Sequence, residues 1–207
     1  SKQKFIIIRM VDNIISQNYY ITNDKRNHAN KYLPHLIWLT GISGSGKSTI
    51  ANELEKSLFK KGVRTFVLDG DNIRLGLNKD LSFSDKDRSE NIRRVAEVSK
   101  LMLDAGIVVI AAFISPFCKD RANVKSIVNN RYVEVFINTS LEECQRRDVK
   151  GLYKKVREGK IKEFTGFSSK YEIPKNPDLE ILTEKEELQI SVNRILKLVE
   201  SKLRIDE

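Results

Sequence analysis

The segment GISGSGKST, residues 41–49, combines glycines, hydroxyl side chains and one lysine. Gly41, Gly46, Lys47 and Ser48 occupy every fixed position of the pattern G-x-x-x-x-G-K-[ST]. Such glycines let backbone N–H groups turn toward phosphate oxygens, the lysine reaches the β- and γ-phosphates, and the serine hydroxyl can ligate Mg²⁺. The segment therefore predicts a binding site for a nucleoside triphosphate. By itself it leaves ATPases, GTPases and kinases open.

Two carboxylates follow the next apolar run, in the segment LDGDNIR. Asp69 and Asp71 flank Gly70, which permits a sharp turn that aims both carboxylates into one cleft. A carboxylate beside a γ-phosphate can hold the Mg²⁺ shell or accept the proton of an attacking hydroxyl. Asn72 and Arg74 add a hydrogen-bonding group and a fork-shaped cation suited to phosphate or sulfate. A plain Asx-type turn at a strand end is the alternative interpretation.

A third polar group lies on a long amphipathic stretch. Arg88, Asn91 and Arg94 recur at i, i+3 and i+6, so they share one face of the expected helix. This helix begins just after LDGDNIR, and its first turn is expected to face the same cleft. The position favours ligand binding for Arg88 and Asn91. For Arg93 and Arg94 a solvated face is an equally good interpretation.

Two later features bear on the same cleft. Ser115 follows an apolar run in FISP, where its hydroxyl can either cap the next helix or contact a substrate. The basic segment from about 149 to 175 is too long and too rich in glycine for a core element, and such loops are often lids. A basic lid excludes water and stabilises charge on a transferred phosphoryl group. Within this segment, Phe164 is either a face on which a base stacks or a packing anchor.

Short apolar runs alternate with longer amphipathic stretches from residue 33 onward. Strands are expected over residues 33–40, 63–71, 107–113, 132–139 and 178–183. Helices are expected over residues 45–62, 85–106, 119–130, 140–148 and 184–203. This alternation predicts a three-layer α/β fold, a mostly parallel sheet with helices on both faces. A strand before GISGSGKST and a helix after it argue against a glycine–serine linker that matches the pattern by chance.

The composition excludes several other classes of protein. The 207 residues suffice for one well-filled domain, and no apolar run approaches the roughly 18 residues of a membrane span. Cys118 and Cys144 lack the spacing of a metal site or disulfide framework, so we expect reduced thiols in a cytoplasmic protein. The net charge of +9 fits nucleic acid or a small polyanionic substrate. Because no nucleic-acid-binding motif accompanies the charge, we expect neither a nucleic-acid nor a membrane partner.

Taken in order, the motifs GISGSGKST, DGDNIR, DRSENIRR, FISP, RDVKGLY and FTG…YEIP closely resemble the adenylylsulfate kinase family. The resemblance covers about residue 13 to the last helix. The phosphate loop is generic, whereas DGDNIR with DRSENIRR and KGLYKK is specific. The resemblance implies the P-loop nucleoside triphosphate hydrolase-like fold. It also implies transfer of the γ-phosphate of Mg²⁺-bound ATP to the 3′-hydroxyl of adenosine 5′-phosphosulfate, as in sulfate assimilation.

The resemblance further implies roles for individual residues. Catalytic positions match Lys47, Asp69 and Ser115, and metal positions match Ser48 and Asp69. ATP-binding positions match Gly41, Ser43, Gly44, Ser45, Gly46, Lys47, Ser48, Thr49 and Arg147. Positions lining the adenylylsulfate pocket match Asp71, Asn72, Ile73, Arg74, Phe83, Arg88, Asn91, Ile114, Ser115, Lys150 and Phe164. Ser115 matches a serine sometimes assigned as a phosphoserine intermediate, although direct in-line transfer needs no covalent step.

The same resemblance implies how the chain is divided into an arm and a domain. Residues 1–32 are expected to form an N-terminal arm, and residues 33–207 a P-loop kinase domain with the lid at about 149–175. Because the family is commonly dimeric, we expect a homodimer with the arm near the interface. Association or fusion with an ATP sulfurylase is left open. So are two other functions: a kinase of another nucleotide-linked anion, and a silent regulatory domain, which would be expected to lack Lys47 or Asp69.

The chain departs from the family pattern at a few positions. Leu75 stands where a histidine is common, Cys118 where an arginine is common and Val149 where a proline is frequent. Phe167 and Ser168 replace Ile-Asp after FTG. None of these changes removes a phosphate-loop or carboxylate group. They are expected to affect pocket contacts and lid motion more than the activity itself.

Overall fold

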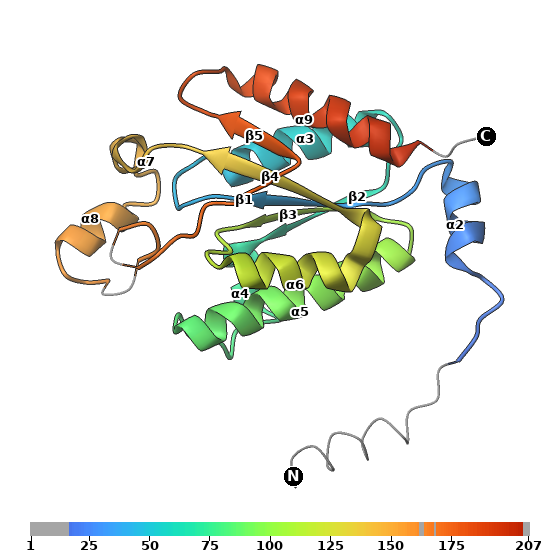
Figure 1. Cartoon of the computed structure of the whole chain (residues 1–207), viewed down its shortest axis with the longest axis horizontal. Coiled ribbons are helices and arrows are strands. Elements are labelled where there is room, and N and C mark those ends of the chain that lie inside the picture. Colours follow the sequence, from blue (N-terminus) through green and yellow to red (C-terminus); the bar gives the residue numbers. More distant parts are fainter. Residues whose placement is uncertain (1–16, 162–163, 168, 205–207) are drawn as a thin grey trace, which may run out of the picture.

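The computed structural model describes residues 17–161, 164–167 and 169–204. Its centre is a sheet of five parallel strands in the order β2-β3-β1-β4-β5 (Figure 1). The strands are β1 Leu36–Thr40, β2 Thr65–Asp69, β3 Val108–Phe113, β4 Tyr132–Asn138 and β5 Leu179–Leu182. Because β1 is the central strand, the phosphate loop that follows it opens at the middle of the sheet edge.

Helices cover both faces of the sheet, which confirms the predicted three-layer α/β fold. The helices α3 and α9 pack on one face, and α5 and α6 pack on the other (Figure 1). The helices are α2 Asn23–Asn30, α3 Lys47–Lys60, α4 Gly70–Leu75, α5 Asp85–Asp104, α6 Cys118–Val128, α7 Leu141–Arg147, α8 Leu152–Arg157 and α9 Leu188–Leu203, with a 3-10 turn at Asn129–Arg131.

The central strand β1 shows why the sheet is buried on both sides. Ile37 and Leu39 pack into the cluster beneath α3 and α9. Leu36 and Trp38 point the other way, into the cluster beneath α5 and α6. All five residues of β1 and all six of β3 are buried. Such near-continuous apolar runs are typical of parallel strands covered on both faces.

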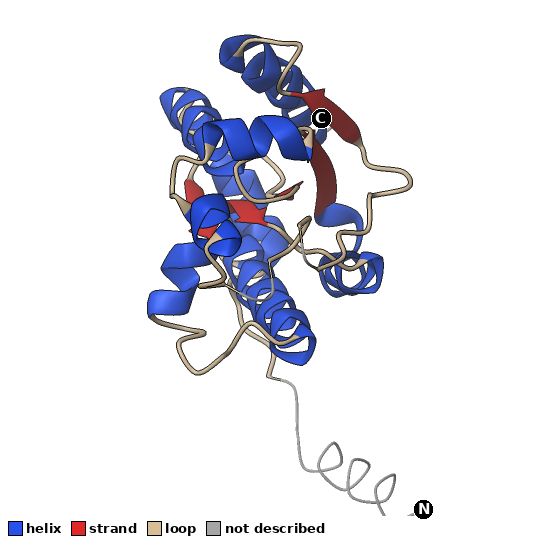
Figure 2. Cartoon of the chain, turned by 90° about the vertical axis from the view of Figure 1, so that its left-hand side faces the viewer, coloured by secondary structure: helices blue, strands red, loops and turns tan. Residues whose placement is uncertain are grey.

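The carboxyl ends of the strands meet at one edge of the sheet, on the left in Figure 1, where α7 and α8 also lie. Figure 2 looks onto this edge. The helix α2 lies at the opposite end, where Asn30 Nδ2 and the Tyr32 hydroxyl both donate to Gly106 O at 3.1 Å. Ligands of parallel α/β sheets bind beyond the carboxyl ends of the strands. The functional site is therefore expected at the α7 and α8 end.

Three local features differ from the sequence-based expectations. The strand expected over residues 63–71 ends at Asp69, and Gly70, expected at a sharp turn, begins the short helix α4, because the Asp69 side chain caps its first turn. The predicted lid contains a helix, α8, with Tyr153 and Val156 buried. The helix expected over residues 140–148 is α7, Leu141–Arg147, because Ser140 is its N-cap: Ser140 Oγ accepts from Glu143 N, and the Ser140 amide donates to the distant Glu184.

Other expectations fall partly outside the described residues. Positions 1–16 of the expected N-terminal arm do so, as do positions 162, 163 and 168 of the lid. Cys118 and Cys144 are free cysteines. Within the described residues, none of the helices has the length and apolar character that crossing a bilayer requires.

Candidate active site

The phosphate loop, residues 41–49, joins β1 to α3. A Cβ atom at Gly41 would lie 2.5 Å from the carbonyl oxygen of Ile137, so a larger residue does not fit where the loop leaves the sheet. Gly44 and Gly46 have φ values of 80° and 100°, which glycine adopts without strain. Gly46 is the N-cap of the 14-residue helix α3, whose N-terminus adds partial positive charge. The loop therefore has the geometry of an anion cradle.

Lys47 is folded back onto this loop. Its Nζ donates to the carbonyl oxygens of Gly41 and Ile42, each at 2.8 Å. Only 8% of the residue is exposed, and this burial lowers the pKa of Lys47 to about 8, although the carboxylate of Asp69 acts in the opposite direction. The ammonium group thus lies inside the cradle, beside the backbone that would surround the phosphates.

Ser48 and Asp69 meet at the mouth of the loop. Ser48 Oγ donates to Asp69 Oδ2 at 2.7 Å, and Asp69 Oδ1 accepts from the backbone N of Asp71 at 3.0 Å. Hydroxyl and carboxylate oxygens are ligands that Mg²⁺ prefers, so the pair fits this ion. Among the described residues, no group of three or more acidic, histidine or cysteine side chains could hold a metal. A Mg²⁺ ion here would need water and phosphate oxygens as well.

A hollow of about 350 Å³ opens beside this pair. It is lined by Ser48, Asn52, Glu55, Val67, Asp69, Asp71, Asn72 and Lys150. Across it, Lys150 Nζ donates to Asp71 Oδ2 at 2.5 Å, and the two side chains are 57% and 71% exposed. An ion pair this exposed contributes little to stability. A charged ligand can therefore take over either partner at small cost.

A larger hollow of about 500 Å³ lies on the β4 side of the phosphate loop. It is lined by Ile42, Phe136, Ile137, Asn138, Thr139, Gly166, Phe167, Ser169, Lys170, Tyr171 and Ile173. Among the described residues, this lining contains no carboxylate that could accept a proton or hold a metal ion. The smaller hollow, by contrast, is lined by Glu55, Asp69 and Asp71, and Asp69 contacts the phosphate loop at Ser48.

Arg74 and Arg88 form the basic side of the cleft. Arg74 Nη1 donates to two carbonyl oxygens of the 81–82 loop, both at 3.1 Å, and its guanidinium lies 4.4 Å from the centroid of the Phe83 ring. Arg88 Nε donates to Phe83 O at 2.7 Å, and its Nη1 donates to Thr165 Oγ1 in the lid. Burial and the nearby charge of Arg88 lower the pKa of Arg74. Two neighbouring cations of this kind are suited to an anionic ligand.

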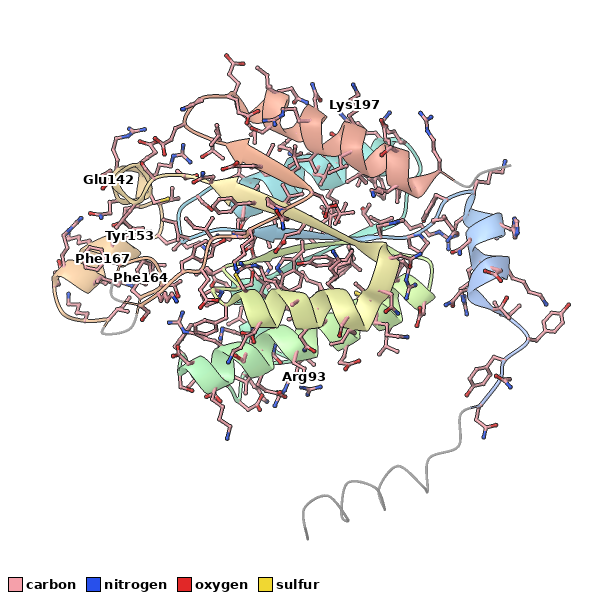
Figure 3. All side chains as sticks on the ribbon, viewed as in Figure 1. Arg93, Glu142, Tyr153, Phe164, Phe167 and Lys197 are labelled. Carbon is pink, nitrogen blue, oxygen red and sulfur yellow. The ribbon has the colours of Figure 1, made fainter. Side chains whose placement is uncertain are left out.

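The remaining polar residues of α5 fall into two groups. Asn91 is 5% exposed, and its Oδ1 accepts from Nδ2 of the fully buried Asn78 at 2.9 Å, in the loop after α4. Arg93 and Arg94 instead form ion pairs with Glu90. Arg93 points away from the body of the protein (Figure 3). The structure favours the solvated face for Arg93, whereas the Arg94 side chain is 28% exposed and also pairs with Asp80 at 2.8 Å.

The predicted lid packs over the phosphate loop. The Tyr153 hydroxyl donates to Ser43 O at 2.8 Å, and the Phe164 ring meets the Tyr153 ring edge-on at 4.9 Å (Figure 3). Both rings are buried with Cys144 and Val156. Of the two interpretations of Phe164, a face for base stacking or a packing anchor, this packing favours the anchor. Tyr153 was not expected at the site, and its aromatic ring in KGLYKK, between lysines, was the signal available.

Arg147 lies at the end of α7, on the β5 side of the loop. Its Nε donates to Glu143 Oε1 at 2.8 Å, and its Nη1 donates to Thr183 Oγ1 at 3.1 Å. The same Nη1 lies 3.9 Å from the position that a Cβ on Gly46 would take. The structure thus brings Arg147 to the phosphate loop from the side opposite the Arg74–Arg88 pair.

Other predicted site residues lie around this cleft in different states of exposure. Ser45 is fully buried and its Oγ accepts from Lys47. Ile73 is partly buried against the core beneath α5 and α6, and the carbonyl oxygen of Ile114 accepts from Thr40. The exposed members are Thr49, Asn72 and Phe83.

Ser115 lies just beyond β3 with φ 40°, and it is 2% exposed. Its Oγ accepts from Trp38 Nε1 at 3.0 Å and donates to Thr40 Oγ1 at 2.9 Å. The N-cap of α6 is Phe117, so Ser115 does not cap that helix. The hydroxyl is instead hydrogen-bonded inside the protein.

Ser115→Ala is expected to retain substantial turnover, because this hydroxyl is held by Trp38 and Thr40 rather than presented at the mouth of the loop. Steady-state turnover would measure the effect. Mass spectrometry of acid-quenched enzyme incubated with ATP is expected to find no phosphate on Ser115. Complete loss of turnover with intact nucleotide binding, or a phosphoserine at this position, would support a covalent route instead.

A five-stranded parallel sheet with a phosphate loop after its central strand, and a carboxylate 2.7 Å from the loop serine, defines a P-loop protein that binds a nucleoside triphosphate. A family model described as adenylylsulphate kinase matches residues 33–182. The chain belongs to the adenylylsulfate kinase family, which confirms the resemblance of its motifs.

Individual relatives agree with this assignment. The adenylyl-sulfate kinase of Staphylococcus epidermidis is 52% identical over 178 residues, which are 86% of this chain and 89% of that protein. The APS kinase CysC of Mycobacterium tuberculosis, solved in complex with AMPPNP and APS, has a TM-score of 0.77 at 44% identity, covering 81% of this chain and 98% of that one. The hexameric APS kinase from Thiobacillus denitrificans has a TM-score of 0.63 at 26% identity, covering 83% of this chain and 30% of that one.

Proposed function

We propose that this protein is an adenylyl-sulfate kinase. It transfers the γ-phosphate of ATP to the 3′-hydroxyl of adenosine 5′-phosphosulfate (APS), giving 3′-phosphoadenylylsulfate and ADP for sulfate assimilation. The observation that carries the proposal is the Ser48–Asp69 pair at 2.7 Å, at the mouth of an intact phosphate loop, in a chain of this family. The loop binds the donor phosphates, and the basic side of the cleft binds the sulfate and phosphate of the acceptor.

In the reaction, the residues of the loop position the donor and Asp69 activates the acceptor. The loop amides and Lys47 hold the β- and γ-phosphates. Asp69 accepts the proton of the 3′-hydroxyl as its oxygen attacks the γ-phosphorus and the bond to the β–γ bridging oxygen breaks. Ser48 and Asp69 would hold Mg²⁺, which when bound offsets negative charge on the phosphates. The lid excludes water, so that transfer to the hydroxyl is favoured over hydrolysis.

The acceptor side of the cleft uses cations that already lie near one another. Arg74 and Arg88 are placed to meet the sulfate and phosphate groups, since a guanidinium recognises such oxygens in pairs. Lys150 extends this side from the lid, and on acceptor binding it exchanges its exposed contact with Asp71 for the ligand. Asn91 of α5, whose side-chain oxygen is held by Asn78, donates its amide N–H to the acceptor.

The test of the proposal is ADP release by purified protein given ATP with and without APS. We expect release that depends on APS. AMP and cytidine nucleotides in place of APS would reveal a kinase of another nucleotide-linked anion. A silent regulatory domain would bind both nucleotides and release no ADP, although Lys47 and Asp69 are both in place.

Arg74→Ala is expected to weaken APS binding chiefly. Hydrogen bonds to charged groups are worth about 1.5–3 kcal/mol, so the KM for APS should rise about 10- to 100-fold while the KM for ATP changes little. Steady-state kinetics with each substrate varied in turn would measure both constants. Arg74→Lys keeps the charge but not the forked guanidinium, so its KM for APS should lie between those of the wild type and Arg74→Ala. Equal increases in both KM values would contradict an acceptor-side role.

We further propose that the enzyme is a cytoplasmic homodimer with the N-terminal arm near the interface. Tyr19, Tyr20 and Ile21 precede α2 and are 78%, 83% and 51% exposed, more apolar surface than an arm in water needs. The hexameric relative from Thiobacillus denitrificans is itself an oligomer. Sedimentation equilibrium of the whole chain would give its mass in solution, and a monomer would contradict this part of the proposal.

A further inference from the structure

The C-terminal end of the lid packs against the edge of the sheet through Tyr171 and Glu172, for which no role has been described above. The Tyr171 ring stacks on Phe136 of β4, with centroids 6.2 Å apart. The next residue, Glu172, donates through its amide to Pro116 O at 2.8 Å, and its carbonyl oxygen accepts from Arg121 Nη2 at 2.7 Å. The lid therefore ends in a segment held from three elements.

Counting protons shows the direction of the hydrogen bond that Tyr171 makes with Thr40. The oxygens of the two hydroxyls are 3.0 Å apart. The single proton of the Thr40 hydroxyl goes to Ile114 O at 2.8 Å, and the Thr40 oxygen accepts from Ser115 Oγ at 2.9 Å. Tyr171 must therefore donate to Thr40. Burial raises the pKa of Tyr171 to about 12, which keeps this donor protonated.

Arg121 hydrogen-bonds both to this segment, at Glu172, and to the backbone at Ser115. Its Nη1 donates to Ser115 O at 2.6 Å, while its Nη2 reaches Glu172 O. The Arg121 side chain is 4% exposed, and Glu134 Oε1 lies 2.9 Å from its Nε. A buried guanidinium with a carboxylate partner and fixed carbonyl acceptors has little freedom to move. Thr40 and Arg121 together therefore define the place where the lid ends.

Residues 164–167 and 169, just before this end of the lid, contact both the phosphate loop and Arg88 on the basic side of the cleft. Ser169 N donates to Phe164 O at 3.0 Å, and Gly166 N donates to Ser169 O at 2.8 Å. Gly166 lies against the phosphate loop, since a Cβ there would be 2.8 Å from Ile42 Cγ2. Thr165, 2% exposed, accepts from Arg88 of the acceptor side. A shift of Tyr171 would therefore move the contact with Arg88.

We infer that Tyr171 is a positioning residue for the acceptor: its hydrogen bond to Thr40 sets the lid so that Thr165 holds Arg88 in place for the anionic substrate. This inference rests on the proposed function. Tyr171 does not touch the Ser48–Asp69 pair. Its effect is expected on acceptor binding and lid position, and not on donor binding.

The test removes one hydroxyl with Tyr171→Phe, which keeps the ring that stacks on Phe136. The net loss of one hydrogen bond is expected to raise the KM for APS about three- to tenfold, with kcat and the Kd for ADP changed less than about twofold. Tyr32→Phe is the matched control, because it removes another buried tyrosine hydroxyl, which donates to Gly106 O at 3.1 Å at the opposite end of the molecule. It should leave all three constants unchanged.

The partner of the hydrogen bond gives a second, independent readout. Thr40→Val should raise the KM for APS as Tyr171→Phe does, and the double variant should be no worse than the larger single effect, because both remove the same interaction. Thr40→Ser keeps the hydroxyl and should restore the wild-type value. Additive effects, or equal increases in the KM for ATP, would overturn the inference.

A third measurement needs no turnover. Lys154, Lys155 and Arg157 of the lid are exposed to trypsin, and Tyr171→Phe is expected to be cut there several-fold faster than wild type in the presence of ADP. An unchanged rate together with an unchanged KM would overturn the inference. Absence of APS phosphorylation by the wild-type protein would instead count against the proposed function, and the trypsin comparison would still decide whether Tyr171 anchors the lid.

Discussion

Replacement of Lys47 by alanine is expected to reduce turnover about a thousand-fold or more, the larger end of what removal of one preorganised donor costs. The ammonium group is already inside the cradle, 2.8 Å from two loop carbonyls, so little rearrangement separates it from the phosphates. By transition-state arithmetic, a thousand-fold loss is about 4 kcal/mol. The measurement is steady-state ADP release with saturating ATP and APS.

The variant needs a control for the loop itself, because Lys47 also holds the loop carbonyls. Lys197→Ala removes a lysine from the outer side of α9, far from the cleft (Figure 3), and should leave turnover unchanged. Thermal unfolding of both variants would show whether the fold is intact. A Lys47→Ala protein that keeps more than about a tenth of wild-type turnover would mean that loop amides and metal suffice for the charge.

Features that depend only on residues adjacent in the sequence were predictable. The phosphate loop needs glycine at positions 44 and 46, where φ is positive, and that requirement is local. The buried strands β1 and β3 were equally clear, because a strand covered on both faces must be apolar at every position. The position of the Asp69 carboxylate at the end of β2 followed from strand direction, since parallel strands end at one edge.

Features that depend on distant partners were not predictable. The Ser140 amide is bonded by Glu184, and Asn91 is held by Asn78 across the loop after α4. Phe164 becomes a packing anchor only because α7 and α8 bring Cys144 and Tyr153 beneath it. Helix α4 is six residues long and begins with glycine, so its local propensity is too weak to distinguish it from a turn.

Asp69→Asn is expected to lower turnover by about 10²- to 10⁴-fold, the usual contribution of a positioned general base. The amide is nearly the same shape, and its oxygen can still cap α4 by accepting from Asp71 N, so the fold should be retained. What it cannot do is take a proton from the 3′-hydroxyl or bring negative charge to a bound Mg²⁺. The loss should therefore appear mainly in kcat, measured as ADP release, while the affinity for metal-free ADP stays near normal.

Two comparisons separate the base from the metal ligand. Asp24→Asn, in the first turn of α2 at the far end of the molecule, should leave kcat unchanged (Figure 1). A Mg²⁺ titration of Asp69→Asn then distinguishes the two roles: a lost ligand is overcome in part by excess metal, whereas a lost base is not. Because Ser48 would remain as a ligand, we expect the deficit to persist at saturating Mg²⁺. Near-normal turnover of Asp69→Asn would exclude Asp69 as the base and direct attention to Asp71 and Glu55, the other two carboxylates that line the hollow.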